Sequence, residues 1–149
     1  MRVSGTISAI LKEKGSQVWT INPNEKVFDA IRLMSDKNVG ALLVVEGEKL
    51  LGVISERDYT RKVALKGKSS RDIAVREIVS TEPVTVTPSH SIEDCMRLMT
   101  LHRIRHLPVI EDAKIAGIVS IGDLVNWIIS AQAMAIGQLE GYIHGQYPA

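Results

Sequence analysis

The chain carries one short pattern twice, as GVISERD at residues 52–58 and as GIVSIGD at residues 117–123. When the sequence is shifted against itself by 65 residues (117 − 52), segment 20–58 aligns with segment 85–123 without a gap. A repeat of this kind indicates that the chain is built from two copies of one supersecondary unit. The identical pairs are Thr20/Thr85, Pro23/Pro88, Asp29/Asp94, Arg32/Arg97, Leu33/Leu98, Met34/Met99, Leu42/Leu107, Val44/Val109, Glu46/Glu111, Lys49/Lys114, Gly52/Gly117, Ser55/Ser120 and Asp58/Asp123.

Hydrophobic spacing predicts the elements of each copy in the order β-α-β-β-α. A short extended piece is followed by a proline-containing turn and an amphipathic helix whose apolar stripe has helical spacing. Two apolar strands joined by a polar turn come next, and a second helix begins after the serine of the repeated pattern. The expected extended pieces are 18–21 and 84–87, the helical stripes are Val27, Ile31, Met34 and Ile92, Met96, Met99, and the strands are 41–45, 50–55, 106–110 and 114–120.

These elements indicate an α/β (α+β) fold in which two repeats pack about a pseudo-two-fold axis. The run LLVV at 42–45 is apolar throughout, which favours a sheet covered on both faces. A unit of roughly 60 residues buries too little surface to be stable alone. Short amphipathic segments, 8–11 and 76–79, precede the units and are expected to complete them. The expected organisation is repeat one at 6–65, a linker at 66–74, repeat two at 75–128 and a C-terminal helical tail at 129–149.

The composition argues against several classes of protein. The formal net charge is +1 and aromatic residues make up 4% of the chain, which argues against nucleic-acid binding. No apolar run approaches the ~20 residues that span a bilayer, and segment 1–15 lacks a signal-peptide pattern. We therefore expect a cytoplasmic protein with neither a membrane nor a nucleic acid as partner. The single cysteine, Cys95, excludes an intramolecular disulfide and is expected in the core.

The repeated S-x-x-D pattern is the first candidate site. Ser55 and Asp58, like Ser120 and Asp123, lie where a strand ends and a helix begins. A hydroxyl, free backbone N–H groups and the positive helix end would meet there and favour a phosphate, while the carboxylate could accept both hydrogens of a ribose diol. Arg57 lies inside the first of these turns. The competing interpretation, favoured by the four-residue pattern alone, is a capping box that needs no ligand.

A basic stretch, HRIRHLPV at 102–109, is the second candidate. Arg103, Arg105 and His106 could neutralise phosphates. The competing interpretation, which is favoured, is a solvated basic helix end that complements the helix dipole. The matching stretch at 37–41 contains no arginine, so two sites, if both exist, should differ in affinity or ligand.

A tryptophan, a pair of histidines and the lack of a catalytic pattern complete the candidate features. Trp19 favours a core role, but its ring could border an adenine. The spacing of His102 and His106 does not support a metal site, because the helix is expected to end between them. No catalytic constellation is visible, so no catalytic or metal-binding residue is expected and the chain is not expected to be an enzyme.

The wording of these stretches closely resembles a tandem pair of cystathionine-β-synthase (CBS) domains, also called a Bateman module. The resemblance rests on GVISERDY (52–59), RIRHLPVI (103–110) and GIVSIGDL (117–124) and extends over about residues 6–128. It implies a stand-alone regulatory module of bacterial type that binds AMP, ADP, ATP, NAD or S-adenosylmethionine in clefts between the repeats, with no catalytic cofactor. It also implies a homodimer, to which the helical stretch 123–143 with Trp127, Ile128, Met134 and Leu139 could contribute, unless that helix folds onto its own subunit.

The resemblance also implies the residues of two clefts. The first would use Ser55, Arg57 and Asp58 with Val84, Thr85, Ile104 and Arg105. The second would use Ser120, Gly122, Asp123, Arg105 and His106 with Trp19, Thr20, Val39, Gly40 and Ala41. Two other functions stay open: a ligand-free protein-interaction module, in which the S-x-x-D turns only cap helices, and a small nucleotide-processing enzyme, which has the least support.

Overall fold

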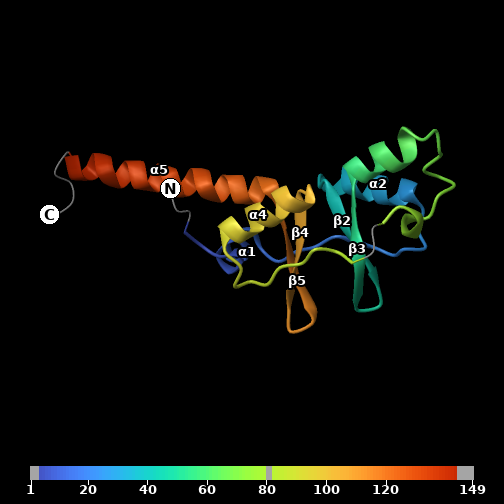
Figure 1. Cartoon of the computed structure of the whole chain (residues 1–149), viewed down its shortest axis with the longest axis horizontal. Coiled ribbons are helices and arrows are strands. Elements are labelled where there is room, and N and C mark those ends of the chain that lie inside the picture. The colour runs from blue at the N-terminus through green and yellow to red at the C-terminus, as the bar shows by residue number, and fades with distance from the viewer. Residues whose placement is uncertain (1–3, 80–81, 144–149) are drawn as a thin grey trace.

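Figure 1 shows the computed structural model of the chain, which describes residues 4–79 and 82–143. Two β-hairpins lie side by side, each with helices near one end, and a long C-terminal helix extends away from the body of the molecule. The architecture is the expected mixture of helices and small sheets. Each hairpin belongs to one copy of the repeat, so the duplication in the sequence is also a duplication in space.

The first repeat contains a three-stranded sheet in the order β1-β2-β3. Strand β2 pairs parallel with β1 and antiparallel with β3, and a bulge lies between Val44 and Val45. The helix that follows β3 continues from a short α-helical turn into a π-helical turn, η1. The elements of this repeat are β1 (Thr20–Ile21), α2 (Val27–Lys37), β2 (Ala41–Glu46), β3 (Lys49–Ser55), α3 (Glu56–Tyr59) and η1 (Thr60–Ala64).

The second repeat has the same hairpin with the same register. His106 pairs with Ser120 as Ala41 pairs with Ser55, and the bulge recurs between Val109 and Ile110. The extended piece expected at 84–87 forms only an isolated parallel bridge, from Val86 to Val109, instead of a strand. The elements of this repeat are α4 (Ile92–His102), β4 (His106–Glu111), β5 (Lys114–Ser120) and α5 (Ile121–Ile143).

Each repeat has its own hydrophobic core, and strand β2 is covered on both faces as expected. Leu42 and Val44 point into the first core, whereas Leu43, which lies on the opposite face, is also fully buried. Cys95 is buried in the second core, as expected. Burial, helped by the nearby charge of Asp94, raises the pKa of the Cys95 thiol to about 11, so the thiol stays neutral.

The segments that precede the repeats are exchanged between them. Helix α1 (Ile7–Lys14) inserts Ile7 and Ile10 into the second core, and the Ile7 N–H donates to the His90 carbonyl at 3.0 Å. The 3₁₀ turn η2 (Val75–Glu77) inserts Val75 into the first core. The expectation that segments 8–11 and 76–79 complete their own repeats is therefore wrong, because each completes the other. This reciprocal exchange is the contact expected of a pseudo-two-fold pair.

Helix α5 begins inside the second repeat and then leaves it. Trp127 and Ile128 pack against the second core, and the Trp127 indole N–H donates to the Ser4 carbonyl at 2.9 Å. Farther along, Ile129, Met134 and Ile136 are exposed. The side chain of Leu139 lies outside what the structure describes. Within the described part of the chain, no helix is long and apolar enough to cross a membrane.

Candidate functional site

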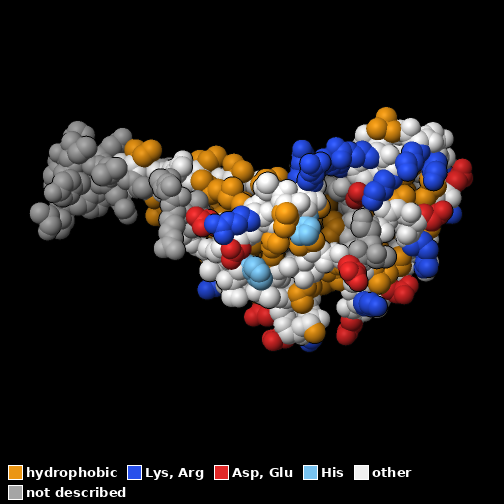
Figure 2. Space-filling model, viewed as in Figure 1, with side chains coloured by type: hydrophobic (Ala, Val, Ile, Leu, Met, Phe, Trp, Pro, Cys, Tyr) orange, Lys and Arg blue, Asp and Glu red, His pale blue; other side chains and the backbone are white. Residues whose placement is uncertain are grey.

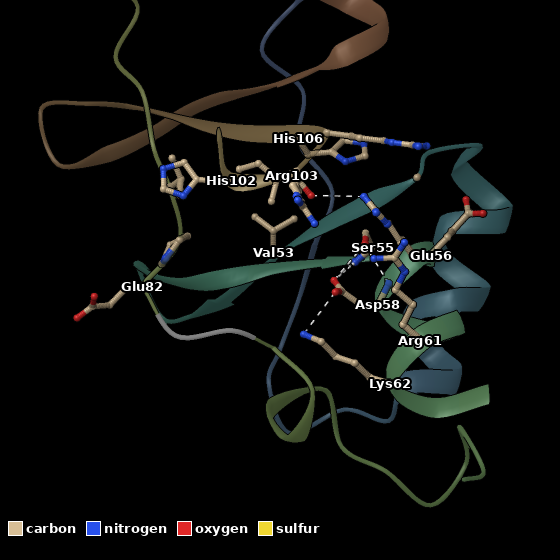
Figure 3. A pocket seen from close by; sticks show the side chains of 16 residues that line it. Val53, Ser55, Glu56, Asp58, Arg61, Lys62, Glu82, His102, Arg103 and His106 are labelled. Atoms are coloured by element: carbon tan, nitrogen blue, oxygen red, sulfur yellow. Dashed lines mark hydrogen bonds and ion pairs between the residues drawn. The ribbon is translucent and has the colours of Figure 1, made fainter. Parts of the chain in front are cut away.

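A cavity of about 600 Å³ lies between the two repeats, and Figure 3 shows the side chains that line it. One wall comes from the end of β3 and from α3 with η1, and the other comes from the α4–β4 turn and from segment 82–84. A pocket of this volume is of the size that holds a small-molecule ligand. The lining residues are Gly40, Val53, Ser55, Glu56, Arg57, Asp58, Arg61, Lys62, Glu82, Pro83, Val84, His102, Arg103, Ile104, Arg105 and His106.

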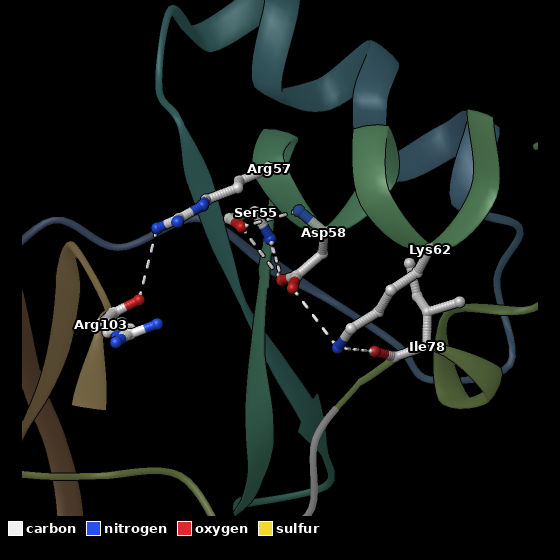
Figure 4. A network of polar contacts seen from close by, with 6 residues as sticks. All are labelled: Ser55, Arg57, Asp58, Lys62, Ile78 and Arg103. Carbon is white, nitrogen blue, oxygen red and sulfur yellow. Dashed lines mark hydrogen bonds and ion pairs between the residues drawn. The ribbon is translucent and has the colours of Figure 1, made fainter. Parts of the chain in front are cut away.

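Ser55 and Asp58 form a capping box at the start of α3. The Asp58 N–H donates to Ser55 Oγ at 3.2 Å, and the Ser55 N–H donates to Asp58 Oδ2 at 2.9 Å. Asp58 Oδ1 lies 3.4 Å from Lys62 Nζ, which also donates to the Ile78 carbonyl at 2.9 Å (Figure 4). The capping interpretation is thus confirmed in geometry. The cap uses Oδ2, and the second carboxylate oxygen, Oδ1, faces Lys62 on the cavity wall.

The Arg57 side chain connects the two walls. Arg57 Nη1 donates to the Arg103 carbonyl at 3.4 Å, a contact between α3 of the first repeat and the end of α4 in the second (Figure 4). Arg103 ends α4 in the left-handed conformation, with φ of 54°, and Asn38 ends α2 in the same way with φ of 55°. The left-handed conformation is easier for asparagine than for arginine.

His106 lies at the start of β4, where its ring meets Gly40 of the other repeat. A Cβ at position 40 would lie 3.5 Å from the His106 ring, an ordinary contact. Burial lowers the pKa of His106 from its usual 6.5, and the charge of Asp123 only partly opposes this, so the ring is neutral at pH 7. No group of three His, Cys, Asp or Glu residues that could hold a metal ion occurs in segments 4–79 and 82–143.

The second S-x-x-D turn has the same cap, but the lysine that pairs with its carboxylate lies closer than Lys62 lies to Asp58. The Ser120 N–H donates to Asp123 Oδ2 at 2.8 Å. Lys14 Nζ from α1 lies 2.7 Å from the same oxygen and also donates to the Ile118 carbonyl at 3.0 Å. Burial raises the pKa of Asp123, but the hydrogen bonds from Lys14 and Ser120 outweigh it and leave the pKa lowered. The chain itself thus supplies a cation to this carboxylate.

The structure brings the residues of the first expected cleft together more fully than those of the second. Asp123 lines a separate hollow of about 270 Å³ between α1 and α5, and Val39 lines a cavity of about 560 Å³ between α2 and α3. Gly40 borders both that cavity and the one between the repeats. The expected residues that line the 600 Å³ cavity are Gly40, Ser55, Arg57, Asp58, Val84, Ile104, Arg105 and His106, and those that line none of the three cavities are Trp19, Thr20, Ala41, Thr85, Ser120 and Gly122.

Trp19 packs against the first core, and Lys37 Nζ lies 4.3 Å from the centre of its ring. The core interpretation of Trp19 therefore describes its position.

Sequence reasoning missed seven of the sixteen residues that line the cavity. Arg61 follows Arg57 by four residues, the spacing that places two side chains on one helix face. This spacing alone was enough to predict Arg61 as a residue of the cavity wall. No pattern in the sequence singles out Glu82 or Pro83, because their place depends on how the connecting segment crosses between the repeats. The lining residues that were not expected are Val53, Glu56, Arg61, Lys62, Glu82, Pro83 and His102, whereas Arg103 was a candidate for phosphate binding.

A duplicated α/β unit with a cavity between its copies defines a class of tandem-repeat modules. The chain belongs to the CBS domain family, whose model matches residues 14–65 and 75–130. It is therefore a CBS domain pair, a regulatory module, as the resemblance of its motifs implies.

Individual relatives agree with this assignment. The chain is 42% identical over 97% of its length to the mitochondrial CBS domain-containing protein CBSX3 of Arabidopsis thaliana, 74% of which is covered. A solved structure of a protein with CBS domains from Burkholderia ambifaria is 47% identical, with a TM-score of 0.83 and coverage of 86% of this chain and 96% of that one. Because CBSX3 is mitochondrial, the cytoplasmic location of this chain stays a prediction.

A more distant structure shares the fold. The CBS domain pair of protein MJ0100, solved with 5′-methylthioadenosine and S-adenosyl-L-methionine, is 22% identical to this chain. The match has a TM-score of 0.71 and covers 82% of this chain and 94% of that one.

Proposed function

We propose that this chain is a regulatory module that binds an adenine nucleotide (AMP, ADP, ATP or NAD) in the 600 Å³ cavity between its repeats. The observation that carries the proposal is the meeting of the Ser55–Asp58 turn with Arg57, Arg103 and Arg105 in that one cavity. A nucleotide requires a carboxylate that accepts hydrogen bonds from its ribose hydroxyls. It also requires arginines nearby that pair with its phosphate.

Each part of the nucleotide has a matching part of the wall. The ribose hydroxyls donate to Asp58, and the phosphate lies near Ser55 and the arginines at the start of α3. The apolar walls at Val84 and Ile104 accommodate the base. The MJ0100 pair holds two adenosine derivatives, which supports the proposal to the extent that the same fold accommodates an adenosyl group.

The proposal assigns one ligand to each chain. Both aspartates face a lysine, but Lys14 lies 2.7 Å from Asp123 and Lys62 lies 3.4 Å from Asp58, so a ribose at Asp123 would have to displace the closer charged partner. The capacity for two ligands that the duplicated motif implies is therefore reduced to one by a residue outside both motifs.

The proposed output is a change in how the repeats pack, rather than a reaction. The Arg57–Arg103 contact spans the cavity, so a phosphate that engages both arginines alters the link between the repeats. A protein partner that distinguishes the two arrangements would read the cellular nucleotide level. This assigns the chain a sensing role without catalysis.

A thermal-shift panel tests the proposal directly. AMP, ADP, ATP, NAD, NADH and S-adenosylmethionine are added singly to pure protein, with inorganic phosphate as the control. A ligand present at 100 times its Kd stabilises the folded state by about 2.7 kcal/mol, which raises the melting temperature by several degrees. A folded protein that responds to no adenine compound would instead be a ligand-free protein-interaction module, the second candidate function.

We further propose that the module is a homodimer held partly by α5. The helix carries no charged residue between Asp123 and Glu140, and Ile129 and Ile136 are exposed on it. An uncharged apolar helix face favours an equally uncharged partner, which a second copy provides. Light scattering should give a dimer for the natural chain and a monomer for the Ile129→Glu/Ile136→Glu variant. Leu101→Glu, at an exposed position on α4, is the matched control, and a natural chain that is monomeric contradicts the proposal.

A further inference from the structure

The cavity between the repeats has more positive than negative side chains on its wall. Three cations come from α3 and η1 and two from the α4–β4 turn, whereas the acidic lining residues are Glu56, Asp58 and Glu82. Figure 2 shows lysine and arginine side chains gathered at the boundary between the two halves of the molecule. The five cations are Arg57, Arg61, Lys62, Arg103 and Arg105.

The five cations of this cavity are not part of the duplicated pattern. At the positions 65 residues away in the other repeat, every one of the five cations is replaced by an uncharged residue. The helix end of the first repeat has its own cation, Lys37, but this lysine lies over the Trp19 ring and does not line the cavity. The replaced pairs are Arg57/Gly122, Arg61/Asn126, Lys62/Trp127, Arg103/Asn38 and Arg105/Gly40.

One of the five cations already pairs with a carboxylate of the cavity wall, and the others include the unpaired positive charge. Lys62 contacts Asp58 Oδ1 at 3.4 Å and the Ile78 carbonyl at 2.9 Å, so it belongs to the ribose end of the cavity. Arg61 and Arg105 form no ion pair with any residue of segments 4–79 and 82–143. The arginines from the two repeats therefore concentrate like charge across one opening, which an anion would relieve.

The left-handed position of Arg103 supports a role in binding. Asn38 has nearly the same φ at the matching helix end, and asparagine tolerates this conformation better than arginine does. Residues held in sparsely populated conformations concentrate at binding sites. Arg103 is thus placed on the cavity wall in a position where asparagine or glycine would suit the backbone better.

We propose that the cavity selects adenine nucleotides with two or more linked phosphates, and disfavours nucleoside monophosphates and the positively charged S-adenosylmethionine. The proposal rests on the proposed function and specifies its ligand. One phosphate is saturated by one or two bidentate arginines, whereas arginines on both walls match a chain of phosphates that starts at Ser55 and extends between them. A sulfonium cation would instead add to the positive charge.

Titration calorimetry tests the selection, with adenosine, AMP, ADP, ATP, NAD and S-adenosylmethionine added to the full chain without divalent cations. The expected order has ATP at least about tenfold tighter than AMP and S-adenosylmethionine weakest. The difference between ATP and AMP should shrink as salt is raised, because screening weakens exposed charges. ADP and NAD both carry a pyrophosphate, so their relative affinities show whether the free terminal charge of ADP contributes.

Two variants replace cavity arginines with the residues of the other repeat. Arg61→Asn and Arg103→Asn should each reduce the ratio of ATP to AMP affinity several-fold and weaken adenosine binding much less than ATP binding. Arg103→Asn should keep or raise the melting temperature, because asparagine already occupies the equivalent helix end. Arg97→Asn is the matched control, since this exposed arginine of α4 pairs with Glu93 and Asp94 outside the cavity.

The outcomes separate the two proposals. Equal affinities of AMP and ATP for the natural chain would overturn the selection for linked phosphates and leave nucleotide binding intact. Tighter binding of S-adenosylmethionine than of ATP would overturn it in the same way. Absence of binding by every adenine compound would overturn the proposed function, and the selection with it.

Discussion

Replacing Ile7 by alanine is expected to destabilise the chain by about 2–5 kcal/mol. Ile7 is fully buried in the core of the second repeat, although it lies before the first repeat in the sequence. Loss of its side chain leaves a cavity in this core, which also contains Ile92, Cys95 and Leu107. Urea unfolding followed by circular dichroism at fixed protein concentration measures the change.

Two further variants make this result diagnostic of the exchange. Ile92→Ala removes the same side chain from the same core and should cost a similar amount. Leu101→Ala, at a side chain that is 76% exposed on α4, should change the stability by less than about 0.5 kcal/mol. If Ile7→Ala is as mild as Leu101→Ala, α1 does not dock on the second repeat in solution.

The repeat made most of the fold predictable. Local periodicity, which occurs in each copy independently, predicts most of the regular elements. These are strands β2, β3, β4 and β5 and helices α2 and α4. The pairing of the hairpins follows because a unit of this size needs a partner surface.

The exchange was not predictable from the sequence. Ile7 and Ile10 would suit either core, and so would Val75 and Ile78. Apolar spacing shows that a segment is buried and does not show which of two nearly identical cores receives it. The choice depends on the path of the connecting segments, which sequence periodicity does not describe.

In the candidate site, too, the features set by local sequence were predictable and those set by packing were not. The S-x-x-D turns were predictable as caps and as candidate ligand positions, since both roles need the same residues at a helix start. The difference between the two turns was only half predictable, from the arginines that one repeat has and the other lacks. The role of Lys14 was hidden, because it reaches Asp123 only through the exchange of α1. An error about packing thus became an error about the site.

Replacing Asp58 by asparagine is expected to weaken nucleotide binding by about 10–100-fold, whereas Asp123→Asn should change it less than about twofold. The amide oxygen of asparagine can still accept from the Ser55 N–H, so the cap of α3 is largely kept. What is lost is the charged acceptor for the ribose hydroxyls, and hydrogen bonds to charged groups are the stronger ones. Titration of both variants with the tightest nucleotide gives the two affinities.

Lys14 decides what the contrast between the two aspartates means. If Asp123→Asn is silent because Lys14 already occupies the carboxylate, Lys14→Ala should free Asp123 and add a second, weaker binding event to each chain. The Lys14→Ala/Asp123→Asn double variant should remove that event again, while the first site stays unchanged. Equal losses in Asp58→Asn and Asp123→Asn would mean that a ligand displaces Lys14 in the natural chain and that both turns bind. No loss in either variant would remove the ribose from the S-x-x-D turns, and the capping boxes would then explain them completely.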